Sequence, residues 1–237
     1  MTLPVAILAG GLATRMRPVT RRLPKSLIDV GGQPFAVRQV ELLREHDVTD
    51  ITFLVGHLGE MVAEALGDGS RWGVRLHYAF DGPSPLGTGG AVRRALPGLG
   101  DPFLLLYGDS YLECDYAAVA GALAAGGTEG LMTVYRNDGR LDRSNVLYDS
   151  GRILAYDKAQ PTPAMRHIDY GLGAFRHSAF AAAAGDAAFD LVSVYQALLA
   201  RDSLAGFEAT HRFYEIGSIA GLEETRAHLA TKASSLP

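Results

Sequence analysis

The chain has 237 residues, of which 48% are hydrophobic and 20% are charged, and its formal net charge is −4. This is the ordinary composition of a soluble globular protein with a sizeable core, and the charge argues against a nucleic-acid-binding surface. Cys114 is the single cysteine, which excludes an intramolecular disulfide and a cysteine zinc cluster. No apolar run approaches the ~20 residues of a membrane helix, and the N-terminus lacks the basic segment of a signal peptide. We therefore expect a cytoplasmic protein with no nucleic-acid or membrane partner.

Residues 5–8 form a short apolar run that predicts a buried strand, and Ala9, Gly10 and Gly11 follow it directly. The loop after these glycines carries five cations and no acidic residue before Asp29: Arg15, Arg17, Arg21, Arg22 and Lys25. Consecutive backbone N–H groups in a glycine turn form a concavity for anions, and Arg and Lys side chains bind phosphate oxygens. The order of strand, glycine turn and cations therefore predicts a triphosphate site, with a solvated basic loop as the alternative.

The next segments alternate between helix and strand patterns. We predict a short extended segment at 27–30, a helix at 34–45, a strand at 51–55, a helix around 61–66 and a strand at 74–80. This order is typical of a parallel sheet that helices cover on both faces. Ligands of such sheets bind beyond the carboxyl ends of the strands, where residues 9–11 and Gly56 would lie.

Residues 83–90 form a glycine-rich loop that leads into a helix ending near residue 96, and Thr88 is a good N-cap residue for it. The segment from Gly87 to Val92 begins like a dinucleotide-binding fingerprint, but it ends in Val92 and follows a loop rather than a strand. The chain also contains no Gly-Lys-Ser/Thr sequence. Both the dinucleotide fingerprint and the P-loop are therefore excluded.

The most hydrophobic strand is predicted at 103–107, and Gly108, Asp109 and Ser110 follow it. A carboxylate at the end of a buried strand, beside a glycine, is well placed to bind a hard cation. A simple turn aspartate is the alternative.

The pattern changes after residue 116. We predict an Ala-rich helix at 116–125, a strand at 130–135, and short extended segments at 145–148, 153–157 and 170–175. A helix at 190–200, short strands at 207–209 and 212–214 and a helix at 222–229 complete the chain, with residues 232–237 expected to fray. We interpret this part as an α+β insert that closes over the site.

The segment from Gly10 to Pro18, Gly-Gly-Leu-Ala-Thr-Arg-Met-Arg-Pro, with Pro24-Lys25 downstream, resembles the signature of the sugar-1-phosphate nucleotidyltransferases. The family loop usually runs Gly-Gly-x-Gly-Thr-Arg-Leu-x-Pro, so Ala13 stands where relatives have glycine. For this segment the resemblance implies two of three catalytic residues, the third being Asp109: Arg15, which would hold the β- and γ-phosphates of a nucleoside triphosphate, and Lys25, which would steady the α-phosphate. It implies further nucleotide contacts from Leu8, Ala9, Gly10, Gly11 and Thr14.

Three more segments extend the resemblance. Leu-Gly-Thr-Gly-Gly at 86–90 is similar to the family loop that lines the nucleobase, which implies base contacts from Gly87 and Thr88. Asp109 corresponds to the family's Gly-Asp aspartate, which holds a catalytic magnesium ion. Glu215, in Glu-Ile-Gly, stands where relatives have the aspartate of Asp-x-Gly-Thr, which is the second metal ligand.

Two segments carry the sugar-phosphate side of the resemblance. Lys158, in Tyr-Asp-Lys-Ala, resembles the lysine of the family's Glu-Lys, which contacts the sugar phosphate, and a solvated hairpin lysine is the alternative. Asp169-Tyr170-Gly171 occupies the place of an Asn-x-Gly that reads sugar hydroxyls, which implies sugar-phosphate-binding roles for Asp169 and Gly171. Asp in place of Asn keeps the acceptors and removes the donors, so different sugar contacts are expected.

The resemblance implies an α/β fold of the nucleotide-diphospho-sugar transferase type, with a Rossmann-like, mostly parallel central sheet flanked by helices. We expect one domain over 1–237, with a nucleotide-binding part at about 1–115 and a sugar-phosphate-binding part at about 116–231. The implied reaction is attack of a sugar 1-phosphate oxygen on the α-phosphorus of the triphosphate, with Mg²⁺ as cofactor and pyrophosphate as the leaving group. Because the nucleophile is already an anion, positioning and charge neutralisation carry the catalysis.

The short chain, the base loop and Tyr-Glu-Ile-Gly near the end most resemble guanylyltransferases that act on heptose or mannose 1-phosphates, which favours GTP. One alternative is a cytidylyl-, uridylyl- or thymidylyltransferase that acts on another sugar phosphate or on a small phosphate or phosphonate. A second alternative, which Ala13 and Glu215 keep open, is a nucleotide-binding regulatory protein without turnover. The expected partners are the nucleoside triphosphate and the sugar 1-phosphate, and a homo-oligomer is compatible with the sequence.

Overall fold

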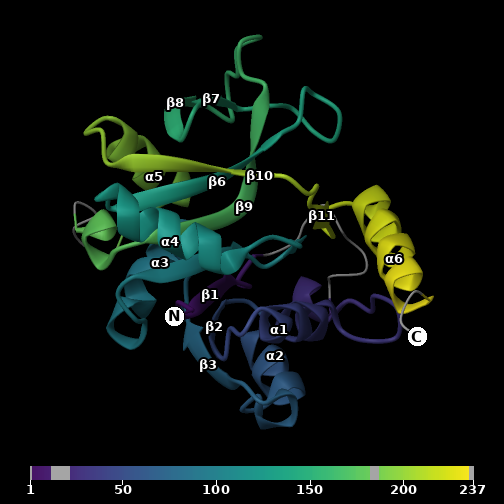
Figure 1. Ribbon diagram of the computed structural model, residues 1–237. Coiled ribbons are helices and arrows are strands. Elements are labelled where there is room, and N and C mark those ends of the chain that lie inside the picture. Colours follow the sequence, from purple (N-terminus) through teal and green to yellow (C-terminus); the bar gives the residue numbers. More distant parts are fainter. Residues whose placement is uncertain (1, 12–21, 182–186, 235–237) are drawn as a thin grey trace.

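The computed structural model of the chain describes residues 2–11, 22–181 and 187–234. Within these residues a nine-stranded sheet has the order β3-β2-β1-β4-β9-β6-β10-β8-β7, and a two-stranded sheet, β11-β5, accompanies it (Figure 1). The strands are β1 (Val5–Leu8), β2 (Asp50–Val55), β3 (Arg75–Phe80), β4 (Phe103–Tyr107), β5 (Ser110–Tyr111), β6 (Gly130–Arg136), β7 (Val146–Asp149), β8 (Arg152–Tyr156), β9 (His167–Phe175), β10 (Leu204–Ala209) and β11 (Tyr214–Glu215).

Most strands of the large sheet run in one direction. β1 pairs in parallel with β2 and β4, β2 pairs in parallel with β3, and β6 pairs in parallel with β10. β9 lies antiparallel between β4 and β6, and the β7–β8 hairpin lies at the far edge. The expected α/β fold with a Rossmann-like, mostly parallel sheet is therefore confirmed.

Helices cover both faces of this sheet. They are α1 (Phe35–Glu45), α2 (Gly59–Leu66), α3 (Gly87–Ala95), α4 (Tyr116–Gly126), α5 (Leu191–Leu199) and α6 (Ile219–Ser234). In β1, Val5 and Ile7 pack with residues of α1, α2 and α4, whereas Ala6 packs with residues of α3 and α5, because the side chains of a strand alternate between its two faces. β1 is thus buried on both sides, as its continuous apolar sequence predicts.

The chain after residue 116 contributes strands to the same sheet, whereas the sequence predicted an α+β insert that closes over the site. β9 pairs with β4 from Phe103↔Phe175 to Leu106↔Leu172, and β6 and β10 continue the sheet beyond β9. Side chains from both halves of the chain therefore reach the carboxyl edge of β4.

Two predicted boundaries in the first half are wrong. The extended segment predicted at 27–30 begins one residue later, because Leu27 still belongs to a 3-10 helix, η3 (Lys25–Leu27), in which its N–H donates to the Pro24 carbonyl at 2.9 Å. The backbone is extended at Ile28, and Asp29 forms an antiparallel β-bridge with Pro34. α3 begins at Gly87 rather than after Gly90. The Phe189 carbonyl, from a distant segment, accepts hydrogen bonds from the N–H groups of Gly89 and Gly90 at 3.0 and 3.2 Å, and so stabilises the first turn of that helix.

The last part of the chain also differs from expectation. β11 covers Tyr214–Glu215 instead of 212–214, because these two residues pair with β5. α6 runs from Ile219 to Ser234, so residues 232–234 are helical where fraying was expected. Lys232 anchors that last turn, because its ammonium lies 3.0 Å from a Glu113 carboxylate oxygen and 3.6 Å from one of Glu45.

Each helix in the described residues falls short of the length or the apolarity that a membrane span requires.

Candidate active site

A cavity of about 480 Å³ opens beyond the carboxyl ends of β1 and β4. Its walls come from both halves of the chain: Leu8, Ala9, Gly10, Gly11, Lys25, Ser26, Leu54, Asp81, Pro85, Gly87, Thr88, Ala91, Tyr107, Gly108, Asp109, Lys158, Asp190, Leu191 and Val192. Ligands of parallel α/β sheets bind at this edge. The structure therefore brings together most of the residues that the sequence predicts for nucleotide binding, together with Asp109 and Lys158.

The glycine turn after β1 is packed closely against its neighbours. The Ala9 N–H donates to Leu54 O at 2.8 Å, and a methyl group on Gly10 would lie 3.1 Å from Gly56 N. The Gly108 N–H donates to Leu8 O at 3.1 Å, so the ends of β1 and β4 touch. Small residues are required where these backbones approach so closely. Of the residues predicted in the loop that follows, Ala13, Thr14 and Arg15 lie outside the described residues.

Lys25 and Asp109 face each other in this cavity. Lys25 Nζ lies 2.7 Å from Asp109 Oδ2, and the two side chains are 20% and 34% exposed. Lys25 is the first residue of η3, and Asp109 lies in the turn that leaves β4. Both are thus predicted site residues that the fold places in direct contact.

Gln39 of α1 fixes the turn that carries Asp109. Its buried Nε2 donates to Tyr107 O at 3.2 Å and to Ser110 O at 2.9 Å, the carbonyls on either side of Gly108 and Asp109. The sequence prediction does not include Gln39. A polar residue on the apolar face of α1, between Phe35 and Leu43, is the signal that could have identified it.

Glu215 lies next to Asp109 because β11 pairs with β5. Glu215 is opposite Ser110 in that pairing, and the Ile216 N–H donates to Asp109 O at 2.9 Å. The Glu215 carboxylate accepts hydrogen bonds from Ser218 Oγ at 2.8 Å and from the Gly217 N–H. A methyl group on Gly217 would lie 2.5 Å from Glu215 Oε2 and 3.2 Å from Asp109 Oδ2, so this glycine leaves open the space beside both carboxylates.

This pair of carboxylates fits a hard divalent cation. Carboxylate oxygens are the preferred ligands of Mg²⁺, which usually takes one or two of them and completes its shell with water and substrate phosphates. No group of three or more His, Cys, Asp or Glu side chains that could hold a metal is found in the described part of the chain. Asp109, which lines the cavity, and the neighbouring Glu215, which is not part of its lining, therefore agree with a magnesium site shared with a ligand and do not form a protein-only metal cage.

Lys158 enters the cavity from the loop after β8, and Asp169 of β9 lies behind it. Lys158 Nζ lies 3.0 Å from Asp169 Oδ2, and the two side chains are 43% and 1% exposed. The same oxygen accepts hydrogen bonds from Tyr107 Oη at 2.7 Å and Tyr156 Oη at 3.2 Å. Burial, reinforced by the Asp169 charge, raises the pKa of both phenols, so they remain protonated donors.

Gly171 packs behind the cavity and is not part of its lining. Between the pairs Met132↔Gly173 and Val134↔Asp169, β9 carries two residues more than β6, so a bulge lies around Gly171. Gly171 has φ +92°, and a methyl group there would lie 2.9 Å from Ser110 Oγ. Its N–H donates to Asp169 Oδ1 at 3.1 Å. Gly171 therefore shapes the strand that presents Asp169.

The predicted base loop also lines the cavity, through Pro85, Gly87 and Thr88. The Thr88 hydroxyl does not cap α3; it accepts a hydrogen bond from the Leu191 N–H, the first residue of α5, at 2.8 Å. Asp81 also lines this cavity and is 7% exposed. Burial raises the pKa of its carboxyl group, against a backbone hydrogen bond from Leu86 and the charge of Arg94. Asp81 is absent from the sequence prediction, although it follows an apolar strand as Asp109 does.

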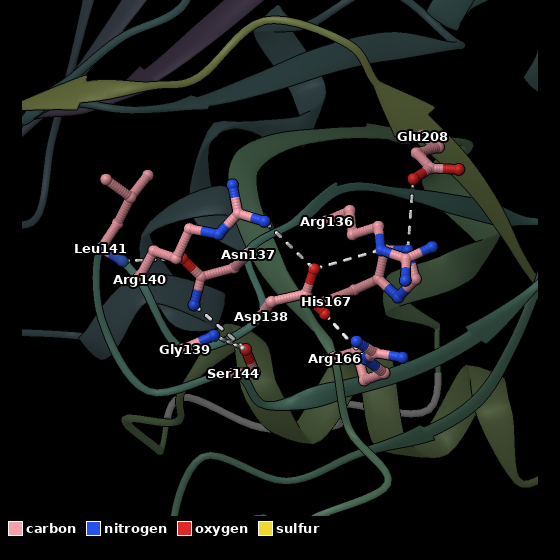
Figure 2. Close-up of polar contacts among 10 residues, drawn as sticks. All are labelled: Arg136, Asn137, Asp138, Gly139, Arg140, Leu141, Ser144, Arg166, His167 and Glu208. Carbon is pink, nitrogen blue, oxygen red and sulfur yellow. Dashed lines mark hydrogen bonds and ion pairs between the residues drawn. The ribbon is translucent and has the colours of Figure 1, made fainter.

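A second cavity, of about 510 Å³, lies among loop residues 138–144 and 161–166. Beside it the Asp138 carboxylate accepts hydrogen bonds from Arg166 Nε at 2.7 Å and Arg136 Nε at 3.2 Å, and Arg140 Nη2 lies 3.6 Å away (Figure 2). The Asn137 N–H donates to Arg166 O at 3.0 Å. These contacts tie the end of β6 to the start of β9, and none of the residues lining this cavity is a predicted site residue.

Comparison with known proteins agrees with this geometry. A family model described as nucleotidyl transferase matches residues 5–143. An N-acetylmuramate alpha-1-phosphate uridylyltransferase of Neisseria meningitidis serogroup B is 40% identical over 113 residues, which are 47% of this chain and 49% of that protein. A mannose-1-phosphate guanyltransferase of Schizosaccharomyces pombe is 36% identical over 132 residues, which are 54% of this chain and 36% of that protein. The chain thus matches half or less of the length of these relatives.

Solved structures match nearly the whole chain. A putative glucose-1-phosphate thymidylyltransferase from Bacillus anthracis, in complex with a sucrose, has a TM-score of 0.81 and 21% identity, with 95% of this chain and 94% of that chain covered. HddC from Yersinia pseudotuberculosis, complexed with GMP-PN, has a TM-score of 0.77 and 20% identity, with 96% and 99% covered. At these identities the likeness concerns the fold, and it agrees with the fold type implied by the sequence.

Proposed function

The chain belongs to the nucleotidyl transferase family, and from this premise we propose that it joins the nucleotidyl group of a nucleoside triphosphate to a sugar 1-phosphate and releases pyrophosphate. One observation carries the proposal: a single cavity holds the glycine turn after β1, Lys25, Asp109 and Lys158. Anion-binding backbone, two cations and a metal-binding carboxylate are what phosphoryl chemistry requires. The nucleotide belongs to the part at about 1–115 and the sugar phosphate to the part at about 116–231.

In the proposed reaction a sugar-phosphate oxygen attacks the α-phosphorus in line. A new P–O bond forms while the bond between the α-phosphorus and the pyrophosphate oxygen breaks. Lys158 binds the sugar phosphate, and Lys25 neutralises the charge that grows on the α-phosphate. Because the attacking oxygen carries no proton, the residues only need to hold the two anions against their mutual repulsion. Arg15 is proposed for the β- and γ-phosphates.

Asp109 and Glu215 would hold the Mg²⁺ ion. The ion supplies positive charge to the phosphates and so lowers the energy of the transition state. Before substrates bind, the Lys25–Asp109 ion pair, at 2.7 Å, holds the Asp109 carboxylate next to the cation proposed for the α-phosphate. The adjacent Gly217 leaves space for a ligand between the two carboxylates.

We assign the base as guanine. The buried Asp81 carboxylate lines the cavity that also contains Gly87 and Thr88 of the base loop. A carboxylate only accepts hydrogen bonds, and the Watson–Crick edge of guanine offers it two adjacent donors, N1–H and the 2-amino group. Uracil and thymine offer one donor there. A guanyltransferase is also among the relatives, beside uridylyl- and thymidylyltransferases, which remain the alternatives.

The test is pyrophosphate release from ATP, GTP, CTP, UTP and dTTP at limiting concentration, with mannose, glucose, heptose and N-acetylmuramate 1-phosphates. We expect release with GTP and one of the sugar phosphates. A clear preference for a pyrimidine triphosphate would contradict the guanine assignment and keep the reaction class. Nucleotide binding without pyrophosphate release from any pair would favour a non-catalytic regulator instead.

A further inference from the structure

The resemblance places Asp169 at the position of an asparagine that reads sugar hydroxyls, yet its carboxylate is enclosed by protein. The side chain is 1% exposed. Oδ2 accepts hydrogen bonds from Tyr107 Oη and Tyr156 Oη and pairs with Lys158 Nζ, and Oδ1 accepts the Gly171 N–H. Three of these donors converge on Oδ2, and Oδ1, which accepts the fourth, is enclosed with the rest of the side chain. With 1% of the side chain exposed, the carboxylate offers no accessible acceptor to a hydroxyl of the substrate.

Lys158, in contrast, is held on one side and open on the other. Its side chain is 43% exposed and lines the cavity. Its ammonium lies 5.4 Å from the centre of the Tyr107 ring and 5.7 Å from the centre of the Tyr156 ring, within the range of cation–π contacts. An ammonium has three donors, and the ion pair with Asp169 uses one of them. The others remain for a phosphate.

Tyr107 connects this arrangement to the metal side of the cavity. It is the last residue of β4, its hydroxyl donates to Asp169, and its carbonyl accepts the hydrogen bond from Gln39. Asp109 follows two residues later. The position of the Lys158 ammonium relative to Asp109 is therefore set by one strand end and not by the flexible lysine chain.

From these contacts we propose that Asp169 is a positioning residue, which fixes the Lys158 ammonium for the incoming sugar phosphate and does not itself contact the sugar. The proposal rests on the proposed function for the identity of the ligand. It predicts that the negative charge of Asp169 matters, whereas a sugar-reading residue would work at least as well with the asparagine of the relatives.

Asp169→Asn separates the two roles, because it keeps the shape and one oxygen of the side chain and removes the charge. We expect a rise of about tenfold or more in KM for the sugar 1-phosphate, with little change in KM for the triphosphate. Lys158→Ala should have an effect at least as large. Because Asp169 acts through Lys158, adding Asp169→Asn to Lys158→Ala should cost nothing further. The proposal would be overturned if the effects of the two substitutions on the KM for the sugar 1-phosphate were additive. It would also be overturned if Asp169→Asn lowered that KM.

Asp138→Asn is the matched control. Asp138 is also an aspartate paired with basic side chains in this half of the chain (Figure 2). It does not line the cavity beyond the carboxyl ends of β1 and β4. We expect its KM for the sugar phosphate to equal that of the wild type. Thermal unfolding midpoints of all variants show whether they fold. If Asp169→Asn does not fold, Tyr156→Phe takes its place, because that variant removes one hydrogen bond to Asp169 and keeps the ring. An unchanged KM for the sugar 1-phosphate in Tyr156→Phe would overturn the proposal.

A measurement without turnover distinguishes failure of this proposal from failure of the proposed function. Acylation of Lys158 by an amine-reactive reagent, quantified by peptide mass spectrometry, reports how firmly the ammonium is held. We expect several-fold faster labelling in Asp169→Asn, and a wild-type rate in Asp138→Asn. If no substrate pair is turned over but the labelling differs, the function is wrong and the positioning contact stands. Equal labelling in the wild type and Asp169→Asn rejects the positioning role.

Discussion

Lys25 Nζ lies 2.7 Å from Asp109 Oδ2, although the two residues are 84 positions apart in the chain. The cation proposed for the α-phosphate and the carboxylate proposed for the metal thus neutralise each other before any substrate enters. Both side chains keep partial contact with solvent, which limits the cost of separating them. When substrates bind, a phosphate can therefore replace Asp109 as the partner of Lys25, and a cation can replace Lys25 as the partner of Asp109.

Lys25→Ala should lower turnover by about 10²-fold or more, the effect of losing one charge-stabilising contact in a transition state. Pyrophosphate release at saturating substrates measures it. Lys232→Ala is the matched control, since that lysine pairs with Glu113 and Glu45 away from the cavity, and it should leave turnover unchanged. Turnover of Lys25→Ala near the wild-type value would contradict the role of this lysine.

Asp109→Asn and Glu215→Gln should each abolish magnesium-dependent turnover, because each replaces an anionic oxygen ligand by a neutral one. Glu215→Asp should keep part of the activity. Gly217→Ala should raise the magnesium concentration needed for half-maximal turnover, because its methyl group would lie 2.5 Å from Glu215 Oε2 and 3.2 Å from Asp109 Oδ2. Titration with Mn²⁺, followed by electron paramagnetic resonance, checks the loss of binding directly. Full binding by Glu215→Gln would remove Glu215 from the proposed metal site.

Asp81→Asn should reduce the preference for GTP over ATP by about tenfold or more, because the amide replaces one of two acceptors by a donor and leaves a guanine donor unpaired. The ratio of kcat/KM for the two triphosphates measures this preference. Asp190→Asn is the control: Asp190 lines the same cavity, but its carboxylate faces the Thr88 hydroxyl at 3.4 Å. An unchanged ratio in Asp81→Asn would remove Asp81 from base recognition.

Glu113 should make the attachment of α6 sensitive to acid. Burial raises the pKa of its carboxyl group, but hydrogen bonds from Lys232 and His228 outweigh burial and bring the pKa below the ordinary value of 4.5. A lowered pKa means that this stabilisation is fully present above about pH 4.5 and is lost as the pH falls through the folded-state value. Glu113→Gln should therefore lower the urea midpoint of unfolding at pH 7. Between pH 5 and pH 3 this midpoint should fall less in the variant than in the wild type, as urea unfolding curves at several pH values would show. Parallel losses in both proteins would contradict this.

The sequence predicts the first four strands of the sheet and the location of the cavity well. β1, β2, β3 and β4 are short runs rich in apolar residues that are followed within two residues by glycine, aspartate or both, so local patterns suffice. The parallel order then places the residues after β1 and β4 at one edge, where the structure has the cavity. The roles of these residues remain predictions, and Thr14 and Arg15 lie outside the described residues.

Features that depend on distant partners could not be predicted. The start of α3 depends on the Phe189 carbonyl, which no local pattern reveals. The enclosure of Asp169 depends on Tyr107 and Tyr156, which come from two other strands. The sequence could have identified Gln39, because it is a polar residue on the apolar face of a predicted helix, and Asp81, because it directly follows a predicted strand. Only the fold shows which groups these two side chains face.

The place of β9 between β4 and β6 decides how the chain can be divided. A fragment that ends near residue 115 would lose β9 and leave β4 as a bare edge strand. That edge is Phe-Leu-Leu-Leu-Tyr, with no charge or proline to block pairing with another copy. Such a fragment would expose an aggregation-prone edge, so the parts before and after residue 115 have to be made as one piece. The turn between β7 and β8 lies at the far edge of the sheet and does not line the cavity, so it is the place for an insert.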